Sequence, residues 1–235
     1  MKKILSLLLA VSASQLLTAQ NSINTQDAES RKKGKVYLST NFDTYLLTSS
    51  LLSSPRVDNK WTTPRFTAFL HIGLNANYDF TSKVGIMAGL NTRNLGFIEK
   101  MDNPSYTIIR RVYTFGIPVA LKIGNLEGNR TFFIIGGGVD FPFNYREKGF
   151  SKRNPKDYKF NEWFSNRTQQ VLPYVFVGAR FNPGVYVKLQ YYPSNMMNTN
   201  YTTTLGGVTT KPYANYKVST TMLSLGFDIK YTPKY

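Results

Sequence analysis

The stretch "FTAFLHIGLNANYDF", Phe66–Phe80, decides the fold of this chain. Its even positions are apolar or aromatic throughout, whereas its odd positions are polar or small except for Phe69. A helix would distribute such residues around its whole circumference, but a strand sends successive side chains to opposite faces. The period of two therefore predicts a β-strand with one apolar face.

The same alternation recurs along the chain from Lys35 onward. It predicts eight strands, at about residues 36–45, 66–80, 84–97, 107–121, 131–143, 171–181, 185–192 and 221–231. In the third of these segments the alternation slips beyond Arg93, which predicts a bulge.

The connections between these segments alternate in length. Only "TSK", "GNLEGN" and "NPG" join the second segment to the third, the fourth to the fifth and the sixth to the seventh. Such short connections are typical of hairpin turns. The other connections run from about ten to about twenty-five residues, and short turns at one rim with longer loops at the other are typical of outer-membrane barrels.

We therefore predict an all-β fold over residues 35–235. It is an eight-stranded antiparallel up-and-down transmembrane β-barrel with short periplasmic turns and longer extracellular loops. The apolar face of each strand then points at lipid and the polar face at the interior. A soluble or periplasmic β-sandwich is the alternative; it shares the alternation, but it predicts turns of mixed length and does not need strands of about 9 to 11 residues.

The first residues of the chain predict export. The segment "MKKILSLLLAVSASQLLTAQ" begins with Lys2 and Lys3, continues as an apolar run and places Ala19 before Gln20. This is the layout of a secretory signal peptide, which we assign to residues 1–19. Residues 20–34 are polar and end in a basic cluster, which predicts a disordered periplasmic lead-in. The expected location is the outer membrane of a Gram-negative bacterium.

The charge and the cysteine count restrict the possible partners. The formal net charge is +16 and the chain has 0 Cys. A basic chain favours anionic partners, and for an exported protein without a recognition-helix pattern these are outer-membrane lipid and lipopolysaccharide phosphates, not nucleic acid. The absence of Cys excludes a disulfide framework and a thiolate metal site.

The interior of an eight-stranded barrel is largely filled by side chains, so we expect no nutrient pore. Its polar side chains must find partners, and we expect a network of hydrogen bonds and ion pairs there. The predicted barrel-interior polar network consists of Asn41, Asp43, His71, Asn75, Asn91, Arg93, Asp140, Lys188 and Asp228.

An enzymatic active site is the alternative to such a structural network. Some eight-stranded barrels modify lipid A with a His and a Ser, and Ser39 and Asp43 could approach His71, which is the single histidine. However, His71 lies mid-strand, away from the outer interface, and no nucleophile motif is present. We therefore predict no enzyme, no cofactor and no metal site.

A basic segment lies between the fifth and sixth strands. It reads "YREKGFSKRNPKDYKFNEWF", Tyr145–Phe164. It is either a solvated loop or a site that contacts lipopolysaccharide phosphates or a protein partner. The residues of this possible anionic-partner loop are Arg146, Lys148, Lys152, Arg153 and Lys156.

The stretch "VYTFGIPVALKIGNLEGNRTFFIIGGGVDFPF", Val112–Phe143, resembles the central hairpin of the PorT-like outer-membrane β-barrel family of the Bacteroidota. The features shared are Ile117-Pro118 followed by aliphatics and Lys122, a turn, and an aromatic strand with a glycine run at 136–138. The segment "VGARFNPGVYVKLQYYPSNMMN", Val177–Asn198, looks like the later hairpin of that family. The resemblance implies an outer-membrane barrel of about eight strands, associated with type IX secretion and gliding, and it implies no catalytic residues.

Two functions remain open at this point. The first is a non-enzymatic barrel that serves as an accessory or scaffold component of an outer-membrane assembly, with an envelope protein as its partner; the resemblance implies type IX secretion. The alternative is a stand-alone structural or surface-interaction barrel that binds lipopolysaccharide or external ligands through its basic loops.

Overall fold

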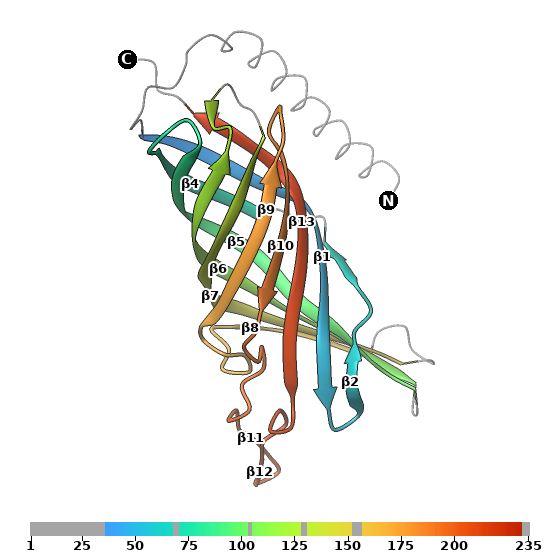
Figure 1. Ribbon diagram of the computed structural model, residues 1–235. Helices are drawn as coiled ribbons and strands as arrows, with labels where there is room; N and C mark the ends of the chain where they lie inside the picture. The colour runs from blue at the N-terminus through green and yellow to red at the C-terminus, as the bar shows by residue number, and fades with distance from the viewer. Residues whose placement is uncertain (1–35, 68–70, 103–104, 128–130, 152–156, 232–235) are drawn as a thin grey trace, which may run out of the picture.

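The computed structural model describes residues 36–67, 71–102, 105–127, 131–151 and 157–231. Eight antiparallel strands form a closed hydrogen-bonded ring (Figure 1). In ring order they are β1 (Val36–Ser54), β4 (His71–Asp79), β5 (Val84–Met101), β6 (Tyr106–Gly124), β7 (Phe132–Ser151), β9 (Leu172–Arg180), β10 (Val185–Tyr192) and β13 (Lys217–Tyr231). The ring closes because β13 pairs with β1 from Leu38↔Tyr231 to Ser53↔Lys217. The predicted fold class is confirmed.

The side chains of the ring alternate between the exterior and the interior as the sequence predicts. In β4 the even positions Ile72 and Leu74 are exposed to the outside, whereas His71, Asn75 and Asn77 are buried. The exposed set continues around the ring and includes Val84, Ile86, Ile117, Val119, Phe133, Ile135, Val175, Val177, Val187, Leu189, Leu223 and Leu225. An apolar exterior around a polar interior is the inverse of a soluble domain, and it suits a barrel surrounded by lipid.

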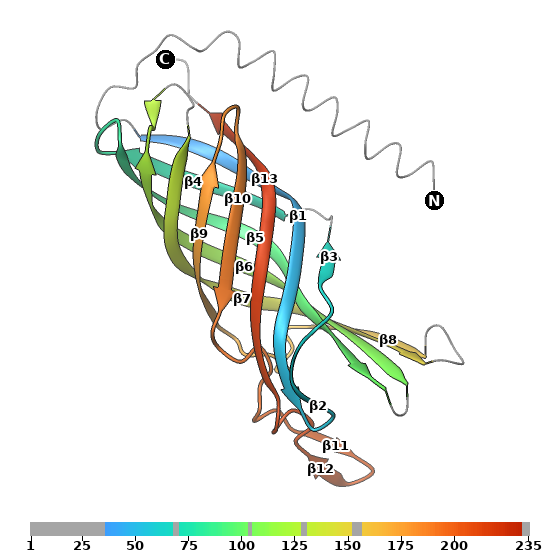
Figure 2. The ribbon, with the colours of Figure 1, turned by 45° about the vertical axis from the view of Figure 1, so that its right-hand side comes forward.

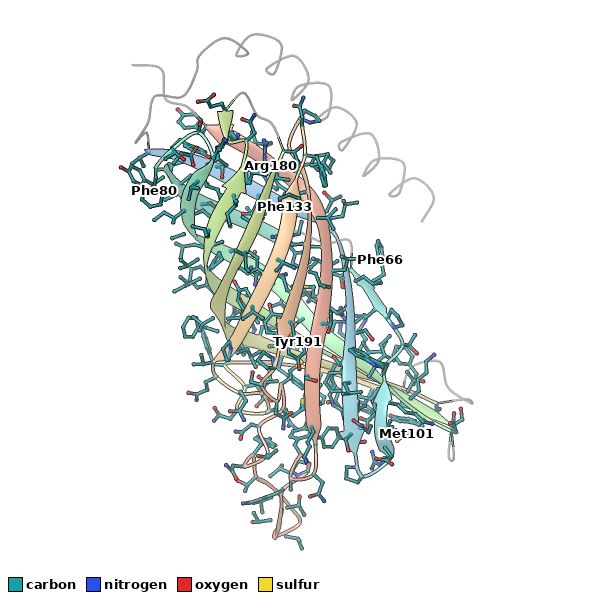
Figure 3. The ribbon with its side chains drawn as sticks, in the orientation of Figure 1. Phe66, Phe80, Met101, Phe133, Arg180 and Tyr191 are labelled. Atoms are coloured by element: carbon teal, nitrogen blue, oxygen red, sulfur yellow. The ribbon has the colours of Figure 1, made fainter. Side chains whose placement is uncertain are left out.

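The two ends of the barrel differ in build. At one end the strands are joined by short turns, and Phe80 and Arg180 lie there (Figure 3). At the other end β5, β6 and β7, of 18, 19 and 20 residues, continue far past the ring, and Met101 marks their tip (Figures 1 and 3). A membrane crossing needs only about 9 to 11 residues, so roughly half of each long strand lies beyond the bilayer.

Short strands complete this outer end. They are β2 (Val57–Trp61) and β3 (Arg65–Thr67), which pair with β1; β8 (Tyr158–Trp163), which pairs with β7; and β11 (Thr203–Leu205) and β12 (Val208–Thr210), which pair with each other. Figure 2 shows β8 and the neighbouring strand ends projecting sideways, and β11 and β12 at the tip.

In its described residues, the segment Tyr145–Phe164 is a pair of hydrogen-bonded strands and not a solvated loop. Its first part continues β7 as far as Ser151, and β8 pairs back onto it from Asn144↔Trp163 to Gly149↔Tyr158. The hairpin forms because β7 remains in register with β6 over its whole outer half, which offers β8 an edge to pair with. Lys152, Arg153 and Lys156 lie outside the described residues.

The bulge predicted beyond Arg93 is also not found between the described strands β5 and β6, which keep one register from Val84↔Ile123 to Met101↔Tyr106. The alternation of apolar and polar residues is lost there because side chains on both faces of β5 are buried against other parts of the protein. Arg65 of β3 donates from Nη2 to the backbone oxygen and to Oδ1 of Asn94, at 3.0 and 2.6 Å. The whole run from Arg93 to Phe97 is consequently buried.

Candidate functional site

The interior of the barrel is the first candidate site, and its polar side chains lie in layers along the barrel axis. Nearest the short turns, the Lys122 ammonium donates to Tyr37 Oη at 2.9 Å and to Asn77 Oδ1 at 3.1 Å. It also forms an ion pair with Asp79. The fully buried Lys122 therefore has three oxygen acceptors, as its three N–H groups require.

Arg180 and Asp228 lie at the same end of the barrel. Arg180 Nε donates to Asp228 Oδ2 at 2.8 Å. Arg180 is buried, whereas the Asp228 side chain is 13% exposed. Asp228 is thus the least enclosed of the residues that the sequence placed inside.

The middle layer centres on Asp43 of β1. Its Oδ1 lies 3.2 Å from Lys188 Nζ and accepts a hydrogen bond from Tyr186 Oη at 2.6 Å. Beside this group, Asn75 Nδ2 donates to Asn41 Oδ1 at 3.3 Å. These contacts join β1, β4 and β10 across the interior.

The next layer towards the outer end is built on Asp140. Arg93 Nη1 lies 3.3 Å from Asp140 Oδ1, and Tyr192 Oη donates to Asp140 Oδ2 at 2.7 Å. Thr114 Oγ1 donates to the same oxygen at 3.2 Å, and the Arg93 guanidinium lies over the Tyr174 ring at 4.5 Å. Because both side chains are shielded from water, the charge of Arg93 and the charge of Asp140 each need the other as a partner.

Two predicted interior residues stand apart from these groups. Asn91 is buried, but its Oδ1 has no hydrogen-bond partner among the described residues. His71 Nε2 accepts a hydrogen bond from the Asn94 backbone N–H at 2.8 Å, and its Nδ1 has no partner in the described part of the chain. Ser39 instead contacts Asn77, so it does not pair with His71 as a nucleophile would.

A further cluster occupies the outer end, beyond the lipid-facing band. Arg110 Nε donates to Glu147 Oε2 at 3.1 Å, and Arg110 also pairs with Glu99. Ser54 Oγ donates to Glu99 at 2.8 Å, and Tyr216 Oη donates to it at 3.1 and 3.2 Å. Burial raises the pKa of Tyr216 to about 12, with Arg110 opposing the shift and Glu99 adding to it.

The second carboxylate of this outer cluster is held by two further tyrosines. Glu147 accepts hydrogen bonds from Tyr145 and Tyr158. Burial raises the pKa of both phenols, and the charge of Glu147 adds to that shift. The cluster therefore fastens β1, β5, β6, β7, β8 and the segment before β13 to one another.

A small cavity of about 30 Å³ lies in the half of the interior nearest the short turns, lined among others by Asn75, Lys122, Arg180 and Lys188. One water molecule needs about 10 to 15 Å³ of such space, so the cavity has room for one or two waters. Within the described ranges, no group of three or more His, Asp or Glu side chains is placed to hold a metal ion.

The predicted polar network leaves out several members of these layers. Alternation places Asp79, Arg180 and Tyr186 on the polar side of their predicted strands, and it turns Lys122, Tyr37 and Tyr192 inward as well. It indicates the direction of these side chains but not the contacts that they make.

In comparisons with known proteins, this chain resembles other proteins in its fold only. No protein-family model and no curated protein sequence matches the chain. Among solved structures, it is similar to Ail, the attachment invasion locus protein of Yersinia pestis, with 15% identity over 84% of this chain and 100% of Ail, at a TM-score of 0.35. It is also similar to Neisserial surface protein A (11% identity, 83% and 97% coverage, TM-score 0.42) and to outer membrane protein AlkL (13% identity, 88% and 96% coverage, TM-score 0.44).

The cellular location follows from the chain's own ring and exterior. Across the described residues, no helix is long and apolar enough to cross a membrane. A closed strand ring leaves no unpaired backbone edge, and its apolar exterior matches the hydrocarbon of a bilayer. The chain is an outer-membrane β-barrel.

Proposed function

We propose that this barrel is a non-enzymatic accessory or scaffold component of an outer-membrane assembly, of the PorT-like kind associated with type IX secretion. The filled interior supports a role that uses the surface of the barrel rather than a path through it. The buried polar groups support the same role, since their contacts join strands to one another, and the His71 ring accepts a hydrogen bond from the Asn94 backbone N–H.

The main support for this proposal is an open strand edge beyond the membrane. There the outer halves of β5, β6 and β7 form a sheet, called the outer sheet, that ends at β8. β8 pairs with β7 and with no other described strand, and it places Asn161 and Trp163 at the surface. Phe164 follows at 78% exposure. An open edge beside exposed aromatic rings is suited to a partner that adds a strand of its own.

The test is to shorten this hairpin and purify the complex. Residues 145–162 are replaced by Asn-Gly, which joins the paired residues Asn144 and Trp163 by a two-residue turn and removes β8 except for Trp163. Tagged protein is then extracted from its native outer membrane in mild detergent. We expect wild type to elute with an envelope protein in fixed stoichiometry, and the shortened variant to elute without it.

Removal of the other outer hairpin provides the control. In this variant Thr203–Thr210, the β11–β12 hairpin, is replaced by a turn of the same kind. Retention of the partner in the control and loss in the β8 variant supports the proposal. Elution of wild type alone would contradict it and favour the stand-alone barrel, and loss in both variants would show that neither edge is specific.

The proposal extends to the ends of the chain. We propose residues 1–19 as a signal peptide and residues 20–34 as a periplasmic lead-in; both lie outside the described residues. Mass spectrometry of the mature protein is expected to place its first residue at Gln20. Retention of Met1 in the membrane-inserted protein would contradict this assignment.

A further inference from the structure

Two arginines, Arg111 and Arg146, lie side by side on the outward face of the outer sheet, away from the polar network of the interior. Arg110 and Glu147 point into the buried outer cluster. The next residues in each strand, Arg111 and Arg146, therefore point to the opposite, outward face. They are directly paired across β6 and β7.

The height of this pair follows from strand geometry. Ten residue steps separate Ile123, near the short turns, from Tyr113 on the same face of β6. At about 3.3 Å per residue and a tilt of about 40°, this distance spans about 25 Å along the membrane normal, which is the height of the apolar band of such barrels. Arg111 is the next outward residue beyond Tyr113, so it lies just outside that band.

An aromatic row marks the boundary below the arginines. The ring centroids of Tyr113 and Phe143 are 6.4 Å apart, and those of Phe143 and Trp163 are 6.0 Å apart and stacked. Trp163 is 63% exposed. Tyrosine and tryptophan in this position are typical of the headgroup level of a bilayer.

A second like-charged pair lies above the arginines. Lys148 of β7 is opposite Lys159 of β8, one outward step beyond the Arg146↔Asn161 pair. None of the described residues in these three outward rows is a carboxylate. The rows are Asn94, Tyr113, Asn144, Trp163; then Gly96, Arg111, Arg146, Asn161; then Ile98, Ile109, Lys148, Lys159.

Such an arrangement is unfavourable for the protein alone. Like charges directly opposite on neighbouring strands destabilise a sheet. The Nε atoms of Arg111 and Arg146 are buried and lack a hydrogen-bond partner in the described part of the chain. Arg65 adds a third guanidinium within electrostatic range of Arg111. The nearby carboxylates Glu147 and Glu162 are paired with Arg110 and Arg167.

We propose that the Arg111–Arg146 pair, with Lys148 and Lys159 above it, binds a phosphate group of a lipid headgroup in the outer leaflet. Guanidinium groups form forked, bidentate hydrogen bonds to phosphate, and two of them side by side match a phosphomonoester. The site faces the surrounding lipid, and the aromatic row below it is placed to contact the sugar and upper acyl chains of the same molecule. A membrane lipid is therefore favoured over a soluble anion.

The test measures lipid binding by the full-length barrel in uncharged detergent micelles. The chain has 2 Trp, so the substitution W61F leaves Trp163, beside the site, as the single tryptophan, whose fluorescence is excited selectively over that of the tyrosines. In this background the protein is titrated with diphosphorylated lipid A and with the same lipid after removal of both phosphates. The double variant R111Q/R146Q is compared with K60Q/K211Q, which removes two exposed outer charges elsewhere.

We expect R111Q/R146Q to bind diphosphorylated lipid A about tenfold or more weakly than wild type, because a paired charge-assisted contact is lost. The control variant and the dephosphorylated lipid should show little difference between proteins. Resistance to SDS before boiling verifies that each variant has folded.

Equal affinity of R111Q/R146Q and wild type would overturn the proposal, and so would equal binding of both lipids. Displacement of the lipid by inorganic phosphate would identify a soluble anion instead and overturn the lipid assignment. The result is independent of the proposed scaffold role, because R111Q/R146Q retains the β8 edge.

Discussion

Arg93 and Asp140 form an ion pair inside the barrel, with Nη1 and Oδ1 3.3 Å apart and the two side chains 2% and 0% exposed. They come from β5 and β7, which are separated in the ring by β6. Tyr192 of β10 completes the group by bonding to both of them. The interior is therefore held by contacts that cross the barrel, in addition to the ladders between neighbouring strands.

Asp140→Asn should destabilise the barrel strongly. It leaves Arg93 buried without a counter-charge, and removal of one partner of a buried pair costs about 3 to 5 kcal/mol. Urea unfolding in lipid vesicles measures the change. Asp58→Asn, an exposed acid in β2, is the control and should change little. Equal stability of Asp140→Asn and wild type would mean that the pair is not needed to hold the interior.

Leu225→Arg tests which face of β13 meets lipid. Leu225 is 40% exposed on the outward face, and arginine at the bilayer midplane costs about 2 to 4 kcal/mol. The same substitution at Val208, which is 64% exposed in β12 beyond the membrane, should cost little. Folding yield in vesicles and urea midpoints report both values. If the two variants are equally stable, Leu225 does not face hydrocarbon.

Gly116→Ala should disturb the Asp140 layer. A Cβ at Gly116 would lie 2.1 Å from Asp140 Oδ1 and 2.5 Å from Asn91 Oδ1, so both side chains would have to move. Overpacking of this kind costs about 1 to 3 kcal/mol. At Gly137, on the outward face, the nearest atom is at 3.0 Å, and Gly137→Ala should be the milder change in the same unfolding assay. The reverse order would contradict the assigned faces.

The outer cluster should loosen at high pH. Tyr216 ionises at about pH 10 when unfolded and at about 12 when folded, because burial disfavours the phenolate. Its contribution to stability is thus complete below pH 10 and is lost as the pH rises through 12. The tyrosinate absorbance of wild type minus that of Tyr216→Phe isolates this group among 16 tyrosines. A difference titration centred near pH 10 would show that Tyr216 is not enclosed.

The sequence predicted the parts of the fold in which one face is apolar. Alternation located β4 and placed β10 at the same bounds, Val185–Tyr192, that the structure shows. It could not predict the β7–β8 hairpin, because there charged residues such as Arg146 and Glu147 occur on both faces and no apolar period exists. That pairing is set by the register with β6, which no local pattern contains.

The sequence predicts which side chains point into the barrel, but it does not predict which of them contact one another. Alternation indicates which residues of a strand point inward, yet the contact from Lys122 to Tyr37 joins residues 85 positions apart. Such pairs depend on the order and stagger of strands around the ring. The slip beyond Arg93 was misread for a related reason, since Arg65 covers the outer face of β5 from a strand distant in sequence.

The central claim is that β1 and β13 close the ring, and a disulfide between them tests it most directly. Ser50 Oγ and Thr220 Oγ1 lie 2.8 Å apart across these strands, and the chain has 0 Cys to interfere. Oxidised S50C/T220C should form the cross-link in membranes and keep its compact form on boiling in SDS. In the control S49C/T220C the two side chains point to opposite faces and should not react. Failure of S50C/T220C to cross-link, or equal reaction of both variants, would contradict a closed barrel.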